Sequence, residues 1–321
     1  MFAPLYLSNE CINSCTYCGF SRENAIIRVT LAADQVAAEA RHLQKEGFRS
    51  VLLVAGEHPK FVSQGYLERC VAAVAAEMPS VALEVAPLET AQYAAMVGAG
   101  AEALVVYQET YDPELYARLH TAGPKRDYAW RLGCPQRAYE AGFRRIGIGA
   151  LFGLGRWRSE ALALASHLEY LLRKCWRAQF TISLPRLRPC AGEFEPADPL
   201  GDRDFTQLLC AFRVCFPQVG IVLSTREPAP LRDALAPLGV TMMSAGSHTE
   251  PGGYTGQGRD SLHHTVRGRQ VPVSSDSPPE RATEQFEIAD ERSPAEVARM
   301  LEGLRLEAVW KDWDAAILGA V

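Results

Sequence analysis

Short apolar runs alternate with longer amphipathic segments along most of the chain. Eight runs have the length and composition of buried parallel strands, at residues 3–7, 51–54, 81–85, 103–107, 145–149, 180–184, 219–223 and 240–243. Helical patterns lie between them, at residues 32–46, 66–77, 127–141, 160–175 and 205–215. The alternation predicts an α/β fold, an eight-stranded (β/α) barrel. An open doubly wound sheet is the alternative, but its G-x-G-x-x-G turn after the first strand is absent.

The C-terminal part of the chain has a different pattern. Residues 246–284 are rich in Gly, Ser, Thr, Pro and Arg, which predicts a long loop or a partly mobile segment. His248, His263 and His264 form no clear metal-binding pattern there, and we expect solvated loop histidines. A helix over about residues 294–302 and a short strand around 306–310 follow. We therefore expect a barrel, residues 1–245, with a loop-rich extension, residues 246–321, packed on it.

Composition and charge narrow the classes of function. The chain has 321 residues, of which 48% are hydrophobic and 22% charged, so it can bury a full-sized core. The net charge of −5 offers no basic excess for nucleic-acid binding. No apolar run approaches the roughly 18 residues that span a bilayer. Nine cysteines in 321 residues are too dilute for a disulfide scaffold, and an odd number cannot all pair, so a cytoplasmic protein with free thiols fits better.

Three cysteines, Cys11, Cys15 and Cys18, follow the first predicted strand within eight residues. In a barrel this is the face on which active sites are built. Three thiolates can hold three irons of a 4Fe–4S cluster and leave the fourth iron open to a cofactor or substrate. A zinc site would need a fourth ligand, and no partner pair of cysteines exists here. Purely structural cysteines remain the other interpretation.

The ordered motifs of the chain resemble the aromatic amino-acid lyases of the radical S-adenosylmethionine (SAM) superfamily. They are PLYLSNECINSCTYCGF, LLVAGEHP, VVYQETY, PRLRPC, LSTRE, PGGY and VWKDWD, and they cover almost the whole chain. The similarity is greatest to the 2-iminoacetate synthases, the tyrosine lyases of thiamine thiazole biosynthesis. The resemblance implies a barrel of the radical SAM type that binds one 4Fe–4S cluster and SAM.

The resemblance also implies which residues bind SAM, whose amino and carboxylate groups would chelate the open iron. The matching positions are Gly56, Glu57, Gln108, Glu109, Arg131, Tyr17 and Phe20. Gly56 allows a close backbone approach, and Glu57 can accept a hydrogen bond from the ammonium group. Gln108 and Glu109 would contact the ribose and amino groups, Arg131 the carboxylate, and the two aromatic rings the adenine. Without the resemblance these are an ordinary turn, a surface arginine and core aromatic residues.

Four further residues are candidates for binding and positioning the substrate. The guanidinium of Arg226, just past a strand, suits bidentate binding of an amino-acid carboxylate, and Ser224 can add a hydrogen bond. A structural salt bridge between Arg226 and Glu227 is the alternative. Tyr6 points into the barrel if strand alternation holds, and its position matches a tyrosine beside the substrate amine in the related tryptophan lyase. Ser244 is expected to line the same pocket.

The activity that the resemblance implies is cleavage of the Cα–Cβ bond of L-tyrosine to 2-iminoacetate (dehydroglycine) and p-cresol. The resemblance also implies that a 5′-deoxyadenosyl radical starts the reaction by removing a hydrogen from the tyrosine amino group. The implied partners are a thiazole synthase and a reductant such as flavodoxin or ferredoxin. A lyase acting on tryptophan or another amino acid and an inactive cluster-binding homologue are the alternatives. The tyrosine lyase of hydrogenase maturation carries a second cysteine set near its C-terminus, whereas no cysteine follows Cys215 here.

The resemblance further implies an N-terminal segment, about a quarter of the family's length, before the first strand. Met1 falls almost inside that strand. We therefore expect either a truncated gene model or a variant without this cap.

Overall fold

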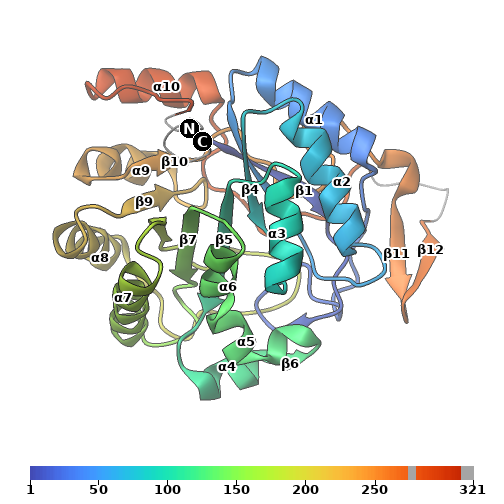
Figure 1. Ribbon diagram of the computed structural model, residues 1–321, viewed down its shortest axis with the longest axis horizontal. Coiled ribbons are helices and arrows are strands. Elements are labelled where there is room, and N and C mark those ends of the chain that lie inside the picture. The colour runs from blue at the N-terminus through green and yellow to red at the C-terminus, as the bar shows by residue number, and fades with distance from the viewer. Residues whose placement is uncertain (274–279, 312–321) are drawn as a thin grey trace.

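The computed structural model, which describes residues 1–273 and 280–311, is built around one curled sheet of eight parallel strands (Figure 1). The strand order is β1-β3-β4-β5-β7-β8-β9-β10. The strands are β1 (Ala3–Ser8), β3 (Ser50–Ala55), β4 (Ser80–Glu84), β5 (Ala103–Glu109), β7 (Arg145–Ala150), β8 (Gln179–Ser183), β9 (Gly220–Leu223) and β10 (Met242–Met243). All eight predicted strands are confirmed, and their order rules out a doubly wound sheet.

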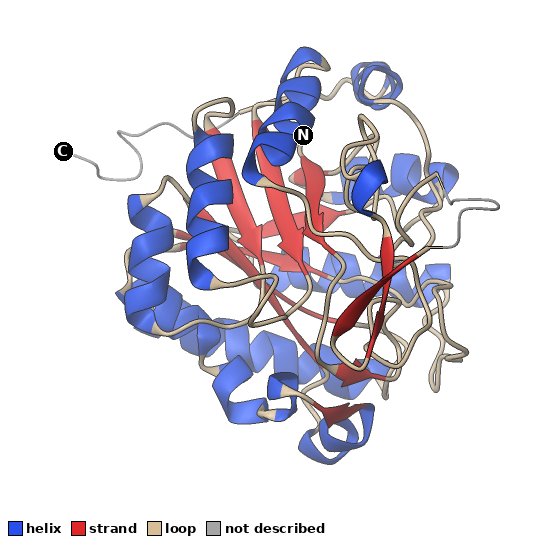
Figure 2. Ribbon diagram, turned by 90° about the vertical axis from the view of Figure 1, so that its right-hand side faces the viewer, coloured by secondary structure: helices blue, strands red, loops and turns tan. Residues whose placement is uncertain are grey.

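The two edges of the sheet meet before β1 and after β10. Phe2 forms a parallel bridge with Ser244, its amide donates to the Met243 carbonyl at 3.1 Å, and Ala245 donates to the Phe2 carbonyl at 3.3 Å. The helices lie outside the sheet, as Figure 2 shows. They are α1 (Ala33–Lys45), α2 (Gln64–Ala75), α3 (Thr90–Gly98), α4 (Pro113–Leu119), α5 (Tyr128–Leu132), α6 (Cys134–Glu140), α7 (Trp157–Lys174), α8 (Asp202–Cys215), α9 (Ala229–Leu235) and α10 (Pro294–Gly303).

Side-chain alternation along the strands produces two cores. On β1, Ala3, Leu5 and Leu7 belong to the large core between the sheet and the helices. Phe2 and Tyr6 belong to a smaller core inside the barrel. Because successive strand residues point to opposite faces, Tyr6 points inward as expected. The barrel interior therefore carries the side chains that can reach a bound molecule.

The helix predicted over residues 127–141 is two helices, α5 and α6, with Gly133 between them. Asp127 caps α5 by accepting a hydrogen bond from the Trp130 amide at 2.8 Å. The break follows from Pro135 in the first turn of α6, because a proline ring clashes with the carbonyl of the preceding helical turn. The prediction missed this boundary although the proline marks it.

The segment predicted as a loop, residues 246–284, contains a β-hairpin of β11 (His263–Val266) and β12 (Arg269–Pro272). Arg267 and Gly268 both have positive φ, of 50° and 74°, as a tight two-residue hairpin turn requires. His263 is not a solvated histidine, because it is buried and its Nε2 lies 2.7 Å from a Glu10 carboxylate oxygen. Residues 274–279 lie outside the described part of this segment.

The predicted final helix is confirmed as α10, but the strand predicted around residues 306–310 is wrong. These residues pair with no strand of the described chain. Leu306 and Val309 are exposed, whereas Trp310 packs on the core and meets Phe48 edge-to-face at 5.4 Å. The rest of the VWKDWD motif, from residue 312 onward, lies outside the described residues.

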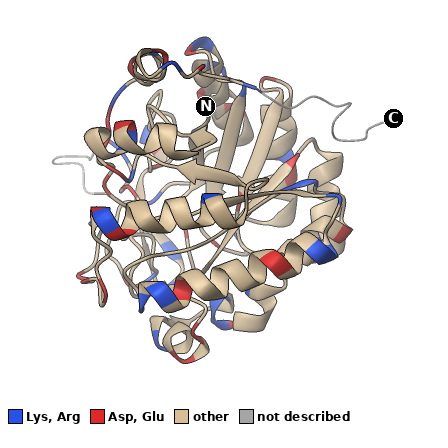
Figure 3. Cartoon of the chain, turned by 90° about the vertical axis from the view of Figure 1, so that its left-hand side faces the viewer, with Lys and Arg blue, Asp and Glu red and all other residues tan. Residues whose placement is uncertain are grey.

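Charged residues of both signs are scattered over the outer helices on the side that holds α7 and α8 (Figure 3). Among the helices within residues 1–273 and 280–311, none has both the length and the apolar composition needed to cross a membrane.

Candidate active site

The three cysteines surround one cavity at the carboxyl ends of the strands. Cys11 and Cys18 flank β2 (Ser14–Cys15), which pairs antiparallel with β6 (His120–Ala122) and thereby fixes the loop. All three are free thiols and border a space of about 630 Å³, called here the cysteine cavity. Burial raises the pKa of Cys15 to about 12 although Lys125 opposes the shift. Binding of iron as thiolate would therefore release protons.

The distances between the cysteines help to distinguish a 4Fe–4S cluster from a zinc site, the two metal sites considered from the sequence. Among the described residues, no three Cys, His, Asp or Glu side chains lie close enough to hold a single metal ion. A 4Fe–4S cluster places each thiolate on a different iron, so its cysteines need not converge on one point. The cysteine cavity thus fits a cluster better than a zinc ion.

Gly56 and Glu57 lie beside the cysteines at the end of β3. A Cβ on Gly56 would stand 2.3 Å from the Glu10 carbonyl oxygen, so only glycine allows this approach to the cysteine loop. The Asn13 amide donates to a Glu57 carboxylate oxygen at 2.6 Å and also approaches Cys11 Sγ at 3.6 Å. Glu57 is therefore a positioned group of the cavity wall and not a solvated turn residue.

Glu109 enters the cysteine cavity because β5 is distorted at its end. The strand register shifts between Tyr107 and Glu109, and Glu109 has φ +71°, which is unfavourable for a side chain other than glycine. Its carboxylate lies 2.6 Å from Lys125 Nζ and 3.5 Å from an Arg131 guanidinium nitrogen. Burial would raise the pKa of Glu109, but these two cations outweigh it and hold the pKa below its usual range.

Arg131, on α5, borders the same cavity and donates from Nε to the Tyr107 carbonyl at 2.6 Å. Gln108 is placed differently. Its amide donates to the Tyr128 carbonyl at 3.4 Å, and it is not among the residues that border the cavity. The structure thus brings Glu109 and Arg131 together and leaves Gln108 on the outer side of β5.

The two aromatic candidates also differ in their surroundings. Phe20 borders the cysteine cavity and meets Tyr6 edge-to-face at 5.8 Å. Tyr17 lies 2.7 Å from His120 Nε2, whose Nδ1 is 2.8 Å from the Tyr116 carbonyl. Because Nδ1–H donates to that carbonyl, Nε2 accepts from the Tyr17 hydroxyl. Burial lowers the pKa of His120 to about 3, so this histidine is neutral.

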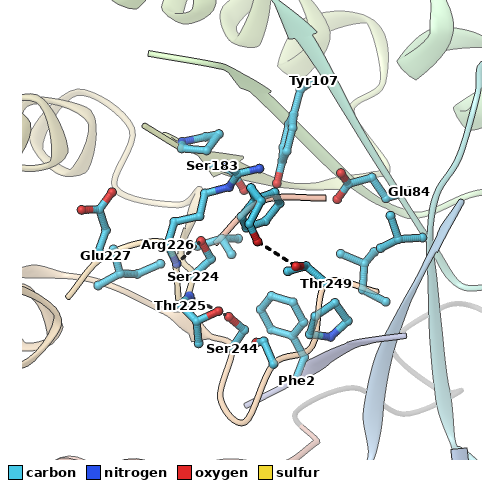
Figure 4. Close-up of a pocket in the computed structure, with 18 of the residues that line it drawn as sticks. Phe2, Glu84, Tyr107, Ser183, Ser224, Thr225, Arg226, Glu227, Ser244 and Thr249 are labelled. Atoms are coloured by element: carbon cyan, nitrogen blue, oxygen red, sulfur yellow. Dashed lines mark hydrogen bonds between the residues drawn. The ribbon is translucent and has the colours of Figure 1, made fainter. Parts of the chain in front are cut away.

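A second cavity, of about 710 Å³, lies beside the first and is called here the Arg226 cavity (Figure 4). Tyr6, Ser224, Arg226 and Ser244 all border it, so the structure brings the four substrate candidates together. The Ser244 hydroxyl accepts from the Thr225 amide at 3.1 Å, which fixes the loop after β9.

Arg226 does not form the alternative salt bridge with Glu227. Glu227 instead forms a salt bridge with Arg186, whose Nε lies 3.0 Å from both carboxylate oxygens. The Arg226 guanidinium stacks on the Phe286 ring at 3.4 Å, and no carboxylate of the described residues is within ion-pair distance. A stacked, unpaired guanidinium inside a cavity is suited to bind an anionic group of a ligand.

The sequence analysis missed four residues of this site, namely Asn13, Glu84, Lys125 and Gln285. Gln285 accepts from the Tyr6 hydroxyl at 2.7 Å and donates toward Cys18 Sγ at 3.8 Å, so the C-terminal extension forms part of the site. Asn13 lies between Cys11 and Cys15, so its position within the cysteine motif could have identified it. Glu84 ends a predicted strand, where polar residues of a barrel gather. No sequence signal marks Lys125 or Gln285.

Comparison with known proteins agrees with this arrangement. Residues 5–166 match the radical SAM superfamily, and residues 183–307 match the biotin and thiamin synthesis associated domain. The chain is 41% identical to 2-iminoacetate synthase of Escherichia coli strain K12 over 98% of its own length and 78% of that protein.

Two solved structures of the FeFe-hydrogenase maturase HydG are also similar. One has a TM-score of 0.85 at 31% identity and covers 97% of this chain. The other, from Carboxydothermus hydrogenoformans, has a TM-score of 0.82 at 36% identity and covers 95% of this chain. This chain spans only 65% and 66% of those two proteins.

Proposed function

This chain belongs to the radical SAM superfamily and, within it, to the 2-iminoacetate synthase family, and we propose that it cleaves the Cα–Cβ bond of L-tyrosine. The products are 2-iminoacetate and p-cresol. The observation that carries the proposal is the junction of two cavities, one bordered by three free cysteines and the other by an unpaired arginine. The identity of 41% to a 2-iminoacetate synthase supports the choice of reaction.

The residues of the cysteine cavity fit a 4Fe–4S cluster with SAM. Cys11, Cys15 and Cys18 would hold three irons, and Glu57 and Arg131 would receive the ammonium and carboxylate groups of SAM. When bound, the cluster and SAM supply the radical that removes one hydrogen atom from the substrate. Lys125 places a buried positive charge beside the cluster position, where it offsets the charge of the thiolates.

The residues of the Arg226 cavity hold the amino acid. Arg226 binds the substrate carboxylate in a bidentate manner, and the Ser224 and Ser244 hydroxyls lie in the same cavity wall. Tyr6 borders the Arg226 cavity and is held by Gln285, which borders the cysteine cavity. Such fixed geometry is what directs a radical to one hydrogen.

The reaction needs two protein partners that we also propose. An electron donor of the flavodoxin or ferredoxin class must reduce the cluster. 2-Iminoacetate hydrolyses readily in water, so a thiazole synthase that takes it directly from this enzyme is the expected acceptor.

The test is a cysteine series with product analysis. Anaerobically reconstituted protein should bind about four irons and form 5′-deoxyadenosine and p-cresol from SAM and tyrosine. Each of Cys11→Ala, Cys15→Ala and Cys18→Ala should lose both products, while Cys215→Ala, at an exposed position, serves as the matched control. An indole product from tryptophan with no p-cresol from tyrosine would contradict the proposed substrate.

A further inference from the structure

Glu84 stands at the junction of the two cavities. It is the last residue of β4, and it borders both the cysteine cavity and the Arg226 cavity. The other residue common to both is the apolar Val54. Figure 4 shows the Glu84 carboxylate pointing into the same space as the Tyr107 hydroxyl and the Arg226 guanidinium. Glu84 is thus an ionisable side chain that a molecule spanning the two cavities would pass.

The carboxylate of Glu84 differs from the other glutamates of the site. Glu57, Glu109 and Glu227 each hold a side-chain partner. Within residues 1–273 and 280–311, the side-chain carboxylate of Glu84 forms no hydrogen bond or ion pair. An acceptor left unpaired in a cavity wall is available to a ligand that brings a donor.

The charges around Glu84 keep it close to the point of changing its protonation state. The groups that face it are Arg226 from the loop after β9, Glu109 and Tyr107 from β5, Arg131 from α5, Lys125 from the turn before α5, and Tyr6 from β1. Burial raises the pKa of Glu84 to about 7, and Glu109 adds to the shift while Arg226 opposes it. A carboxyl group of this kind exchanges a proton near neutral pH.

We propose that Glu84 is the base that removes a proton from the substrate ammonium group before a hydrogen atom is taken from that nitrogen. The inference rests on the proposed function. A substrate whose carboxylate is bound at Arg226 would place its amino group toward the cysteine cavity, where the cluster and SAM would supply the radical. Glu84 borders both spaces. An amino acid enters from neutral water as an ammonium ion. Removing a hydrogen atom from an ammonium ion would leave a more highly charged radical than removing it from an amine.

The proton step is balanced without any further reactant. One N–H bond of the ammonium breaks heterolytically, and its proton passes to a carboxylate oxygen of Glu84. The electron pair stays on nitrogen, so the products are a neutral amine and a neutral carboxylic acid. No group is oxidised or reduced in this step, and the Glu84 proton returns to solvent when the products leave.

The experiment compares Glu84→Gln with native enzyme over a range of pH, measuring p-cresol and 5′-deoxyadenosine together. Native kcat/KM should fall tenfold per pH unit below about 7, because protonated Glu84 cannot accept a proton. The variant should lose about a hundredfold at pH 7, and its rate should rise with pH as free tyrosine loses its own proton. Glu302→Gln, on the exposed side of α10, is the matched control and should behave as the native enzyme does.

Iron content and melting temperature show whether the Glu84→Gln variant is folded. A second variant, Glu84→Asp, keeps a carboxylate, so its kcat/KM should still fall at acidic pH as in the native enzyme, but from a lower maximum. A Glu84→Gln enzyme that keeps the native acid limb, or changes only KM, would overturn the role of Glu84 as a base. If the native enzyme makes no p-cresol at all, the proposed function fails instead. The two failures are therefore distinguishable.

Discussion

At the scale of single residues, the surroundings of Arg226 favour a ligand-binding role over a structural one. Its neighbour Glu227 is already engaged by Arg186, so the guanidinium remains without a carboxylate among the described residues. The Phe286 ring, 3.4 Å away, fixes the guanidinium plane and leaves its nitrogens for a ligand.

Replacement of Arg226 by lysine should therefore keep the positive charge but lose the paired donors that bind a carboxylate. Lysine cannot form two parallel hydrogen bonds with a carboxylate, so kcat/KM for p-cresol formation should fall roughly a hundredfold. Cleavage of SAM without product should survive better, because Arg226 borders the substrate side. The ratio of p-cresol to 5′-deoxyadenosine measures this uncoupling. Native p-cresol rates in Arg226→Lys, alongside an unaffected surface control such as Arg173→Lys, would show that Arg226 is not the anchor.

Residues that belong to a motif could be predicted from the sequence, whereas residues that reach the site from elsewhere could not. Cys11, Glu57 and Arg226 sit in short patterns whose chemistry is recognisable. Lys125 reaches the cysteines only because β2 pairs with β6, and Gln285 only because the extension folds back over the barrel. Such proximity is a property of tertiary packing and leaves no local periodicity in the sequence.

At the scale of elements, the β11–β12 hairpin is tied to the start of the cysteine loop. His263 Nδ1 lies 2.8 Å from the Ser261 carbonyl and Nε2 lies 2.7 Å from Glu10, so both ring nitrogens have acceptors. Burial alone would lower the pKa of His263, but these hydrogen bonds raise it. Burial would raise the pKa of Glu10, but hydrogen bonds from His263 and Thr265 lower it.

The pair predicts a pH-dependent contribution to stability. A raised histidine pKa stabilises the fold fully below the ordinary value of 6.5, and this contribution is lost as pH rises through the folded value. A lowered glutamate pKa contributes fully above 4.5 and is lost as pH falls. His263→Gln should therefore cost most between these values, on the order of 1 kcal/mol of unfolding free energy.

The measurement is urea unfolding of His263→Gln and native apoprotein at pH 5.5 and pH 9. The difference between the two proteins should shrink at the higher pH. The exposed Arg173→Lys variant is the control for general effects of substitution. An equal difference at both pH values would show that the charge of His263 does not contribute.

Elements with strong local patterns could be predicted, and elements defined by pairing could not. The eight barrel strands are continuous apolar runs because both of their faces are buried. The hairpin residues Arg269–Pro272 are all exposed, so no burial pattern marks them. The strand expected near residue 308 was wrong because apolar composition alone does not supply a neighbouring strand.

At the scale of the whole molecule, the segment after residue 280 contributes side chains to both cavities and is anchored beside them. Gln285 and Phe286 reach the two cavities, and the next residues dock on the loop after β9. The Ala289 amide donates to the Thr225 carbonyl at 2.8 Å. Asp290 then forms a completely buried ion pair with Arg232 of α9. The position of these cavity residues thus depends on an ion pair that borders neither cavity.

This anchor is a network rather than a single pair. Arg292 lies 2.7 Å from Asp290 and 2.8 Å from Asp233, and Arg232 also donates to the Ser244 carbonyl. Ser244 is itself a residue of the Arg226 cavity wall. Displacement of the C-terminal extension would therefore change the wall of the Arg226 cavity directly.

Removal of one member of the buried pair should be more damaging than removal of both. Asp290→Leu leaves the Arg232 charge in the interior without its main partner, which should cost about 3–5 kcal/mol of unfolding free energy. The double variant Arg232→Met with Asp290→Leu replaces both charges by apolar groups and should regain much of that loss. Denaturant unfolding of the single and double variants, with p-cresol formation as a second readout, measures the coupling. Equal losses in the single and double variants would show that the unpaired charge of Arg232 is not the source of the loss.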